Sequence, residues 1–155
     1  MMKHNLSFYT AYNQFYIRDK DSNGDTGSPT FWSQEAFKDR LAEGDGLLGV
    51  STESYGFING YLYLLEKPKD LTELDVFDHV VEASVQIKSG VLQIIDCPNS
   101  SVELEIKLSP GVYRVRIYSL GLGTDEDDEG DDSYIIELWP DSKQNRKVIK
   151  RWNKS

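Results

Sequence analysis

Hydrophobic and polar residues alternate along most of this 155-residue chain, and this alternation constrains its fold more than any other feature. Residues 101–108 (SVELEIKL) place four aliphatic side chains on one face and charged side chains on the other. Residues 112–118 (VYRVRIY) repeat the pattern, with Arg114 and Arg116 on the polar face. A period of two predicts β-strands that have one dry and one wet face, as in antiparallel sheets.

Turn-forming residues divide the alternating runs into short strands. Ser89-Gly90 is a short hairpin signal, and Pro110-Gly111 has the residues of a type II turn. Several short strands at close spacing predict a mostly β fold, either an antiparallel β-sandwich or an open barrel. The predicted strands are 7–18, 47–53, 57–66, 80–88, 91–96, 101–108, 112–120, 134–139 and 146–152.

One short α-helix is predicted at about 33–43. Ser33 can cap its first turn, because the hydroxyl accepts an amide hydrogen that has no partner within the helix. Phe37 and Leu41 are four residues apart and would share one face. Gly44 is a suitable residue to end the helix.

Charge is spread unevenly over a chain whose length suits a single domain, 1–155. The net charge is −9, and the acidic loop at 125–132 holds seven acids. The basic C-terminal segment, 142–155, holds six bases and no acid, so residues 1–141 carry 26 acids against 11 bases. A nucleic-acid binder usually has a broad basic face. The acidic body instead favours a basic protein partner and no direct contact with nucleic acid.

Three roles are open for the acidic loop: a metal site, a solvated loop, or a surface for a basic partner. Metal sites gather ligands from positions that fold toward one point, whereas consecutive carboxylates repel one another, so we expect no metal there. A solvated loop is the usual structure of such a run, and the charge alone does not distinguish it from a binding surface. The candidate partner-binding residues are Asp125, Glu126, Asp127, Asp128, Glu129, Asp131 and Asp132.

Residues 19–30 (DKDSNGDTGSPT) resemble a calcium-binding loop in part. Asp19, Asp21 and Asn23 occupy the first, third and fifth positions of that motif, and a glycine follows. However, Thr30 stands where a bidentate glutamate is needed, and a strand precedes the loop instead of a helix. We therefore expect a polar loop between a strand and the helix.

The residues needed for catalysis are sparse. His4 lies in a terminus that we expect to fray, and His79 follows Asp78 at the start of a strand. No G-x-S-x-G elbow is present, and the single cysteine, Cys97, has neither a C-x-x-C partner nor a disulfide partner. We expect a protein without enzymatic activity or cofactor. A small hydrolase that uses His79 is kept as an alternative class.

The sequence also predicts a cytoplasmic protein that does not enter a membrane. It has no apolar run near the roughly 20 residues that a membrane span needs. Its first 15 residues lack the apolar core of a signal peptide, and a lone cysteine fits a reducing compartment.

Two stretches of the chain carry a family resemblance. Residues 31–52 (FWSQEAFKDRLAEGDGLLGVST) combine a tryptophan, a short acidic helix, a DG pair and a strand. Residues 108–122 (LSPGVYRVRIYSLGL) and 131–140 (DDSYIIELWP) combine a Pro-Gly turn with two tyrosine-bearing strands. This pattern resembles the competence protein J family, small acidic inhibitors of a DNA-entry nuclease. It also resembles related bacterial immunity proteins, such as those of contact-dependent growth inhibition.

The resemblance implies a β-sandwich that binds and occludes a nuclease without chemistry of its own. It favours the partner-binding role for the acidic loop. The expected function is that of an inhibitor or immunity protein that neutralises a basic nuclease toxin and so protects the producing bacterium. The alternative is a β-sandwich ligand-binding or regulatory module whose acidic loop is only solvated. The acidic loop is longer than in the family and the basic tail is an extension, so no site residue is carried over.

Overall fold

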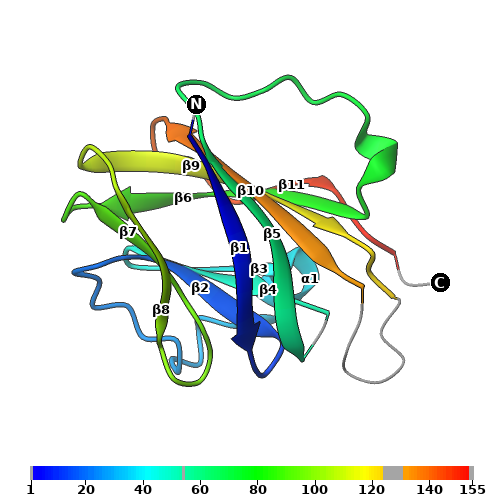
Figure 1. The fold of residues 1–155 in the computed structure, drawn as a ribbon, viewed down its shortest axis with the longest axis horizontal. Helices are drawn as coiled ribbons and strands as arrows, with labels where there is room; N and C mark the ends of the chain where they lie inside the picture. Colours follow the sequence, from blue (N-terminus) through cyan, green and yellow to red (C-terminus); the bar gives the residue numbers. More distant parts are fainter. Residues whose placement is uncertain (1, 54, 124–130, 154–155) are drawn as a thin grey trace.

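The computed structural model describes residues 2–53, 55–123 and 131–153, which form two β-sheets and one short α-helix (Figure 1). The six-stranded sheet has the order β1-β5-β10-β9-β6-β11, and the five-stranded sheet has the order β3-β4-β2-β7-β8. The predicted mostly β fold, a sandwich or open barrel with one short helix, is confirmed. No helix in the described ranges is long and apolar enough to cross a bilayer.

The strands of the six-stranded sheet are β1 (Met2–Thr10), β5 (Gly56–Leu64), β6 (His79–Ile87), β9 (Gly111–Leu120), β10 (Ser133–Pro140) and β11 (Lys147–Lys150). Those of the five-stranded sheet are β2 (Gln14–Asp19), β3 (Leu41–Gly44), β4 (Leu47–Ser51), β7 (Val91–Ile95) and β8 (Val102–Lys107). Neighbouring strands are antiparallel except β5 and β10, which run parallel with Ser133 opposite Asn59. A 3-10 turn, η1 (Leu74–Val76), lies in the long connection from β5 to β6.

Two predicted connections differ from the structure because the chain changes sheets there. The run 7–18 is not one strand: β1 and β2 are separated at Tyr12 and Asn13, whose φ angles of 58° and 57° break the extended backbone. The hairpin predicted at Ser89-Gly90 is also wrong, since β6 and β7 belong to different sheets. A turn signal alone does not show whether the flanking strands pair with each other or with strands far away in the sequence.

The helix α1 (Gln34–Asp39) is shorter than predicted. Ser33 caps it as expected, with the Ala36 amide donating to the Ser33 hydroxyl at 3.1 Å. It ends at Arg40, which adopts a left-handed φ of 60°, and not at Gly44. Leu41 then begins β3 and is fully buried, whereas Phe37 is exposed, so these two residues do not share a helix face.

The main core lies between the two sheets and is built from the inward-facing half of each alternating strand. Phe8, Phe15 and Tyr134 form its aromatic centre, with Phe15 edge-on to both other rings at centroid distances of 5.4 and 6.3 Å. A smaller cluster joins α1 to the five-stranded sheet; its buried members are Tyr16, Phe31, Ala36, Ala42, Leu47 and Ile95.

Asp19 fastens the turn between β6 and β7 to the end of β2. Its carboxylate accepts the Lys88 amide at 2.9 Å, the Ser89 amide at 3.2 Å and the Ser89 hydroxyl. Burial acts to raise the pKa of this carboxyl group, but the hydrogen bonds outweigh burial and lower the pKa below its ordinary value. The Asp19 carboxylate therefore links the two sheets. The aspartate at the first position of the calcium-like motif thus has a structural role.

We predict that Asp19→Ala lowers the free energy of unfolding at pH 7 by about 2 kcal/mol, because three donors lose their charged acceptor. Because the folded-state pKa is lowered, this stabilisation is present above the unfolded pKa of about 3.9 and is lost as the pH falls. Urea titrations at pH 7 and pH 3 should therefore show a smaller difference between variant and wild type at pH 3. Asp21→Ala, at an exposed position of the same loop, is the control; an equal loss for both variants would contradict the assignment.

Candidate functional site

Part of the outer face of the six-stranded sheet is covered by two connecting segments. Arg116 donates to the Lys69 carbonyl at 3.1 Å, in the connection between β5 and β6. Arg114 donates to the carbonyls of Gln144 and Asn145 at 3.1 and 2.9 Å, in the segment that leads to β11. The two arginines are only 2% and 4% exposed, so the polar face predicted for β9 is not a wet face.

The covered half of this face contains a buried ionic network. Glu82 bridges Arg114 and Arg116 with N–O distances of 3.1 and 2.7 Å. The Tyr118 hydroxyl donates to Glu137 at 2.6 Å and accepts a hydrogen bond from Arg116 at 3.1 Å. Burial, together with the charge of Glu137, raises the pKa of Tyr118 to about 12. These groups satisfy one another beneath the covering segments and are not open to a substrate.

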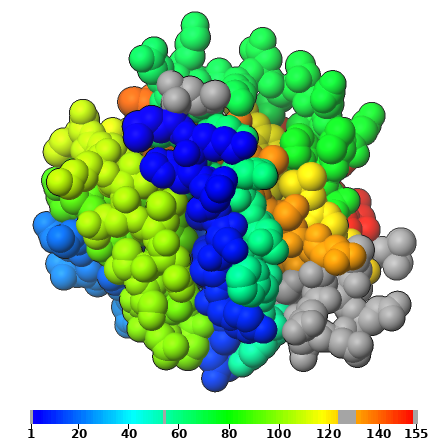
Figure 2. Space-filling model, in the orientation of Figure 1, coloured from blue at the N-terminus to red at the C-terminus, as the bar shows by residue number. Residues whose placement is uncertain are grey.

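Among the described residues, no segment covers the other half of the outer face, which is rich in aromatic side chains. Five of them, which we call the aromatic face, are between 40% and 60% exposed: Tyr9, Tyr12, Tyr55, Phe57 and Tyr61. They extend over β1, β5 and the turns that precede β2 and β5. Figure 2 shows β1 and β5 side by side at the surface, with β10 next to β5. Exposed aromatic residues that gather in one place are typical of protein-binding surfaces.

Edge-to-face contacts hold the aromatic face together. Tyr9 and Phe57, which oppose each other across β1 and β5, have ring centroids 5.3 Å apart. Tyr12 and Tyr55, on the neighbouring turns, have centroids 5.8 Å apart. Four of the five rings are therefore pre-ordered in two pairs, which lowers the entropy lost when a partner contacts them.

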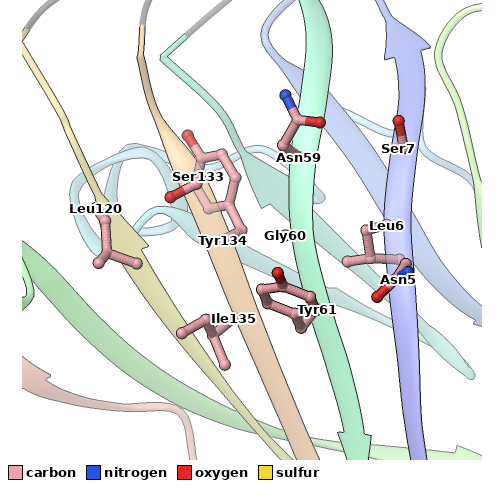
Figure 3. A pocket seen from close by; sticks show the side chains of 10 residues that line it. All are labelled: Asn5, Leu6, Ser7, Asn59, Gly60, Tyr61, Leu120, Ser133, Tyr134 and Ile135. Atoms are coloured by element: carbon pink, nitrogen blue, oxygen red, sulfur yellow. The ribbon is translucent and has the colours of Figure 1, made fainter.

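A groove of about 560 Å³ adjoins the aromatic face (Figure 3). It runs over β1, β5 and β10 toward the end of β9, and its lining includes Asn59, Tyr61 and Ile135. Gly60 lies at its floor, where a Cβ atom would approach the Tyr134 carbonyl oxygen to 1.8 Å. Only glycine fits this close approach of β5 to β10, so Gly60 is needed for the pairing of the two strands beneath the groove.

The acidic loop joins β9 to β10. Asp125, Glu126, Asp127, Asp128 and Glu129 lie outside the described residues, and their predicted role remains a prediction. Asp131 is exposed. Asp132 is 4% exposed and accepts hydrogen bonds from the Tyr134 hydroxyl at 2.5 Å and the Glu53 amide at 3.0 Å. Because its carboxylate is inside the protein, we do not include Asp132 in the surface that we propose below.

Both ends of the acidic loop are fixed to the body. On the β9 side, the Leu122 amide donates to Asp78 at 2.9 Å, and Gly121 has a left-handed φ of 70°. A Cβ atom on Gly121 would lie 2.5 Å from the Asp131 carbonyl oxygen, so the two ends pass very close to each other. On the β10 side, burial and the charge of Asp132 raise the pKa of Tyr134 well above its ordinary value, which keeps its hydroxyl protonated as a donor.

The strand register places the acidic loop and the aromatic face at the same end of the sheet. Ser133, the first residue of β10, is opposite Asn59, and Phe57 is opposite Tyr9. The chain reaches β10 from Asp131, at the end of the sheet where β1 finishes and β5 begins (Figure 1). An acidic segment and a cluster of exposed rings are thus presented together.

His79 is a structural residue in this fold. It is 1% exposed; its Nδ1 accepts the Trp152 amide at 3.1 Å, so Nε2 carries the hydrogen that it donates to the Asp39 carbonyl at 2.8 Å. Burial, aided by the charges of Arg40 and Arg151, lowers the pKa of His79 to about 4. The open arrangement that a His79 hydrolase needs is not found. The second histidine, His4, does not lie in a frayed end but in β1, opposite Leu62.

The basic C-terminal segment is folded against the body. Arg146 and Arg151 both pair with Asp39, at 2.7 and 2.6 Å, and Arg146 also approaches Glu43 at 3.3 Å. Lys150 donates to the carbonyls of Leu74 and Phe77. The two arginines neutralise acids near α1, and Lys150 holds the connection between β5 and β6. These three bases therefore do not form a free basic surface. Within the described ranges, no group of three metal-ligating side chains is found.

The fold is similar to that of two solved structures. The crystal structure of ComJ, inhibitor of the DNA degrading activity of NucA, from Bacillus subtilis, matches 90% of this chain and 99% of ComJ, with a TM-score of 0.68 and 17% identity. The structure of crocagin biosynthetic gene J matches 92% of this chain and 100% of that chain, with a TM-score of 0.58 and 17% identity. No family model matches the sequence, and no curated protein sequence matches it. At such identities, the similarity establishes the fold alone.

We predict that Asp132→Ala destabilises the protein by about 2–3 kcal/mol, because the buried Tyr134 hydroxyl and the Glu53 amide lose a charged acceptor. Asp70→Ala, which removes the same charge from an exposed position in the connection between β5 and β6, should change stability by less than about 0.5 kcal/mol. Thermal or urea unfolding of the two variants measures the difference. Similar stability of both would show that Asp132 does not anchor the acidic loop.

We also predict that the His79 ring titrates near pH 4 in the folded protein. Since the unfolded pKa is about 6.5, the unfolded chain binds a proton between pH 6.5 and pH 4 that the folded chain does not. Stability should therefore be complete above pH 6.5 and should fall as the pH drops through this window. NMR titration of the imidazole resonances measures the midpoint, and His79→Gln should flatten the decline. A midpoint near 6.5 would contradict the buried, neutral state.

Proposed function

We propose that this chain is a non-enzymatic inhibitor that binds a nuclease and blocks the access of nucleic acid to its cleft. The observation that carries the proposal is the fold, which matches that of ComJ over nearly the whole length of both chains. The distribution of charge supports it, because a body with 26 acids and 11 bases repels nucleic acid and attracts the basic cleft of a nuclease. The buried ionic network and the buried His79 are engaged in contacts within the protein, which is compatible with a binding role for this chain.

Occlusion is the proposed mechanism. A nuclease lines its cleft with lysine and arginine to hold the phosphates of its substrate. The carboxylates of the acidic loop would occupy those positive charges in place of phosphates. Complementary charges mainly accelerate association, so binding should be fast at low salt and slower as salt rises.

In its finer form, the proposal is that the target is a toxin and that this chain is its cytoplasmic immunity protein. An immunity protein must bind before the toxin damages the nucleic acid of the producing cell. A strongly acidic surface suits that need, because electrostatic steering can raise association rates by one or more orders of magnitude.

The direct test is to mix the purified chain with a nuclease encoded by a neighbouring gene and to measure cleavage of DNA and of RNA. We expect complete inhibition at a molar excess of the chain. Unchanged cleavage of both substrates would refute the proposal. Inhibition of one substrate alone would identify the nucleic acid that the target cuts.

A second experiment tests the acidic loop without unfolding the protein. Asp125, Glu126, Asp127, Asp128, Glu129 and Asp131 are replaced by Asn or Gln, and Asp132 is kept because it is buried. We predict that the association rate with the nuclease at low salt falls at least tenfold and that its salt dependence flattens. Stopped-flow or surface plasmon resonance measurements give both quantities. An unchanged rate would leave the loop with a solvating role only.

The alternative, a ligand-binding or regulatory module, has one specific observation in its favour. The groove beside the aromatic face is large enough for a small molecule, and the fold also occurs in the product of a crocagin biosynthetic gene. Stabilisation of this chain by a small molecule, combined with unchanged nuclease cleavage, would favour this second function.

A further inference from the structure

We infer that the aromatic face is the anchor of the interface and that Tyr9 and Phe57 receive lysine and arginine side chains of the nuclease. The inference rests on the proposed function for the identity of the partner. It adds the surface and the contact chemistry, which neither the acidic sequence nor the fold similarity provides. Charged loops accelerate binding, but tight complexes also need a few aromatic or arginine contacts that exclude water.

The same sheet already shows the proposed contact within the chain. The Lys3 ammonium group lies 4.1 Å from the centroid of the Tyr61 ring and 5.9 Å from that of Tyr63. Lys69 lies 4.9 Å from the Tyr63 centroid. Rings along β5 therefore bind cations at the end of the strand that is remote from the acidic loop. At the near end, Tyr9 and Phe57 contact each other, and no cation–ring contact is found for either in the described part of the chain.

The exposure of these rings is suited to stacking. Tyr9 is 60% exposed and Phe57 is 48% exposed, and their edge-to-face contact leaves ring surface open to solvent. Gly56 has no side chain beside Tyr9: a Cβ atom there would lie 3.5 Å from the Tyr9 ring. A guanidinium or ammonium group over an aromatic face is attracted by the ring quadrupole, and the attraction increases when water is excluded.

Charge complementarity selects a cationic partner over the other possible occupants. Without the buried Asp132, the acidic loop holds six acids, and its attachment to β10 is at the same end of the sheet as Tyr9 and Phe57. A second copy of this chain would bring an identical acidic loop to the contact, and a nucleic acid would bring phosphates. The acidic loop would repel both. A cleft lined with lysine and arginine could instead form ion pairs with the loop and cation–π contacts with the rings.

The two parts of the surface then have separable kinetic roles. Long-range attraction by the acidic loop sets the association rate, and short-range stacking on the aromatic face sets the dissociation rate. The double variant Tyr9→Ala/Phe57→Ala should therefore raise the dissociation rate of the nuclease complex roughly tenfold or more, with an association rate within about twofold of wild type. Phe37→Ala is the matched control, because Phe37 is 61% exposed but lies on α1 beside the five-stranded sheet.

The experiment has two arms on the full chain. In the first, an acetylated octa-arginine peptide is titrated into the ¹³C-labelled protein while the aromatic NMR resonances are observed. We expect saturable shifts at Tyr9 and Phe57, with Phe37 unchanged, and at least a tenfold weaker affinity for the double variant. In the second arm, association and dissociation rates with the neighbouring nuclease are measured for wild type, the double variant and Phe37→Ala.

The outcomes separate this inference from the proposed function. Peptide shifts that avoid Tyr9 and Phe57, or equal dissociation rates for the double variant and wild type, would overturn the inference while inhibition still stands. The wild-type chain could instead bind the peptide through the aromatic face and leave nuclease cleavage unchanged. This result would refute the proposed function and support the cation-binding surface. A concentration-dependent dimer of the free chain that contains Tyr9 and Phe57 in its interface would also overturn the inference. Circular dichroism melts of the double variant confirm that it is folded.

Discussion

The hydrogen bonds of Asp132 determine how the rest of the proposed surface is arranged. Asp132 is the last acid of the run, but its carboxylate points inward to Tyr134, in the aromatic centre of the core, and to the Glu53 amide, close to the start of β5. One buried carboxylate therefore joins the acidic loop, the core and the strand that carries Phe57. The attachment of Asp131 and Asp132 to β10 is therefore held at the end of the sheet that carries the aromatic face.

The buried network in the covered half of the outer face removes charged side chains from the surface that carries the aromatic residues. Arg114, Arg116 and Glu82 would otherwise be exposed on the same surface as the aromatic residues and would add competing positive charge. The segments from Leu65 and from Asp141 lie over them, and backbone carbonyls of these segments accept hydrogen bonds from both guanidinium groups. A buried network of this kind contributes little net stability compared with apolar packing, but loss of one member leaves an uncompensated charge. Because these segments cover the strands from β10 to β6, the exposed aromatic residues are confined to β1, β5 and their turns.

Sequence patterns predicted the fold well because alternation, caps and turn residues act locally. The strand assignments from β4 onward and the Ser33 cap depend on neighbours a few residues apart, and they agree with the structure. Local patterns do not show which distant segments contact each other. Ser89-Gly90 was predicted to form a hairpin, but Asp19, seventy residues away, holds that turn between two sheets. The burial of Arg114 was missed for the same reason, since the segment that covers it is distant in sequence.

The aromatic face has a signal in the sequence, in the residues that alternate with the buried ones. Tyr9, Phe57 and Tyr61 occupy the alternate positions to the buried Phe8, Ile58 and Leu62, where a wet face should carry polar residues. Aromatic residues at the outward-facing positions of a strand, where polar residues are usual, indicate a surface that binds a partner. The acids of the loop are contiguous in the sequence, whereas these rings become neighbours only when β1 pairs with β5.

Hydroxyl-radical footprinting of the chain, free and in complex with the neighbouring nuclease, tests the central claim most directly, because it reports the solvent access of individual tyrosine and phenylalanine side chains. We predict that the oxidation of Tyr9, Tyr12, Tyr55 and Phe57 falls strongly in the complex, while that of Phe37 on α1 is unchanged. Protection of Phe37 with continued oxidation of Tyr9 and Phe57 would contradict the account, since the nuclease would then bind the opposite side of the fold.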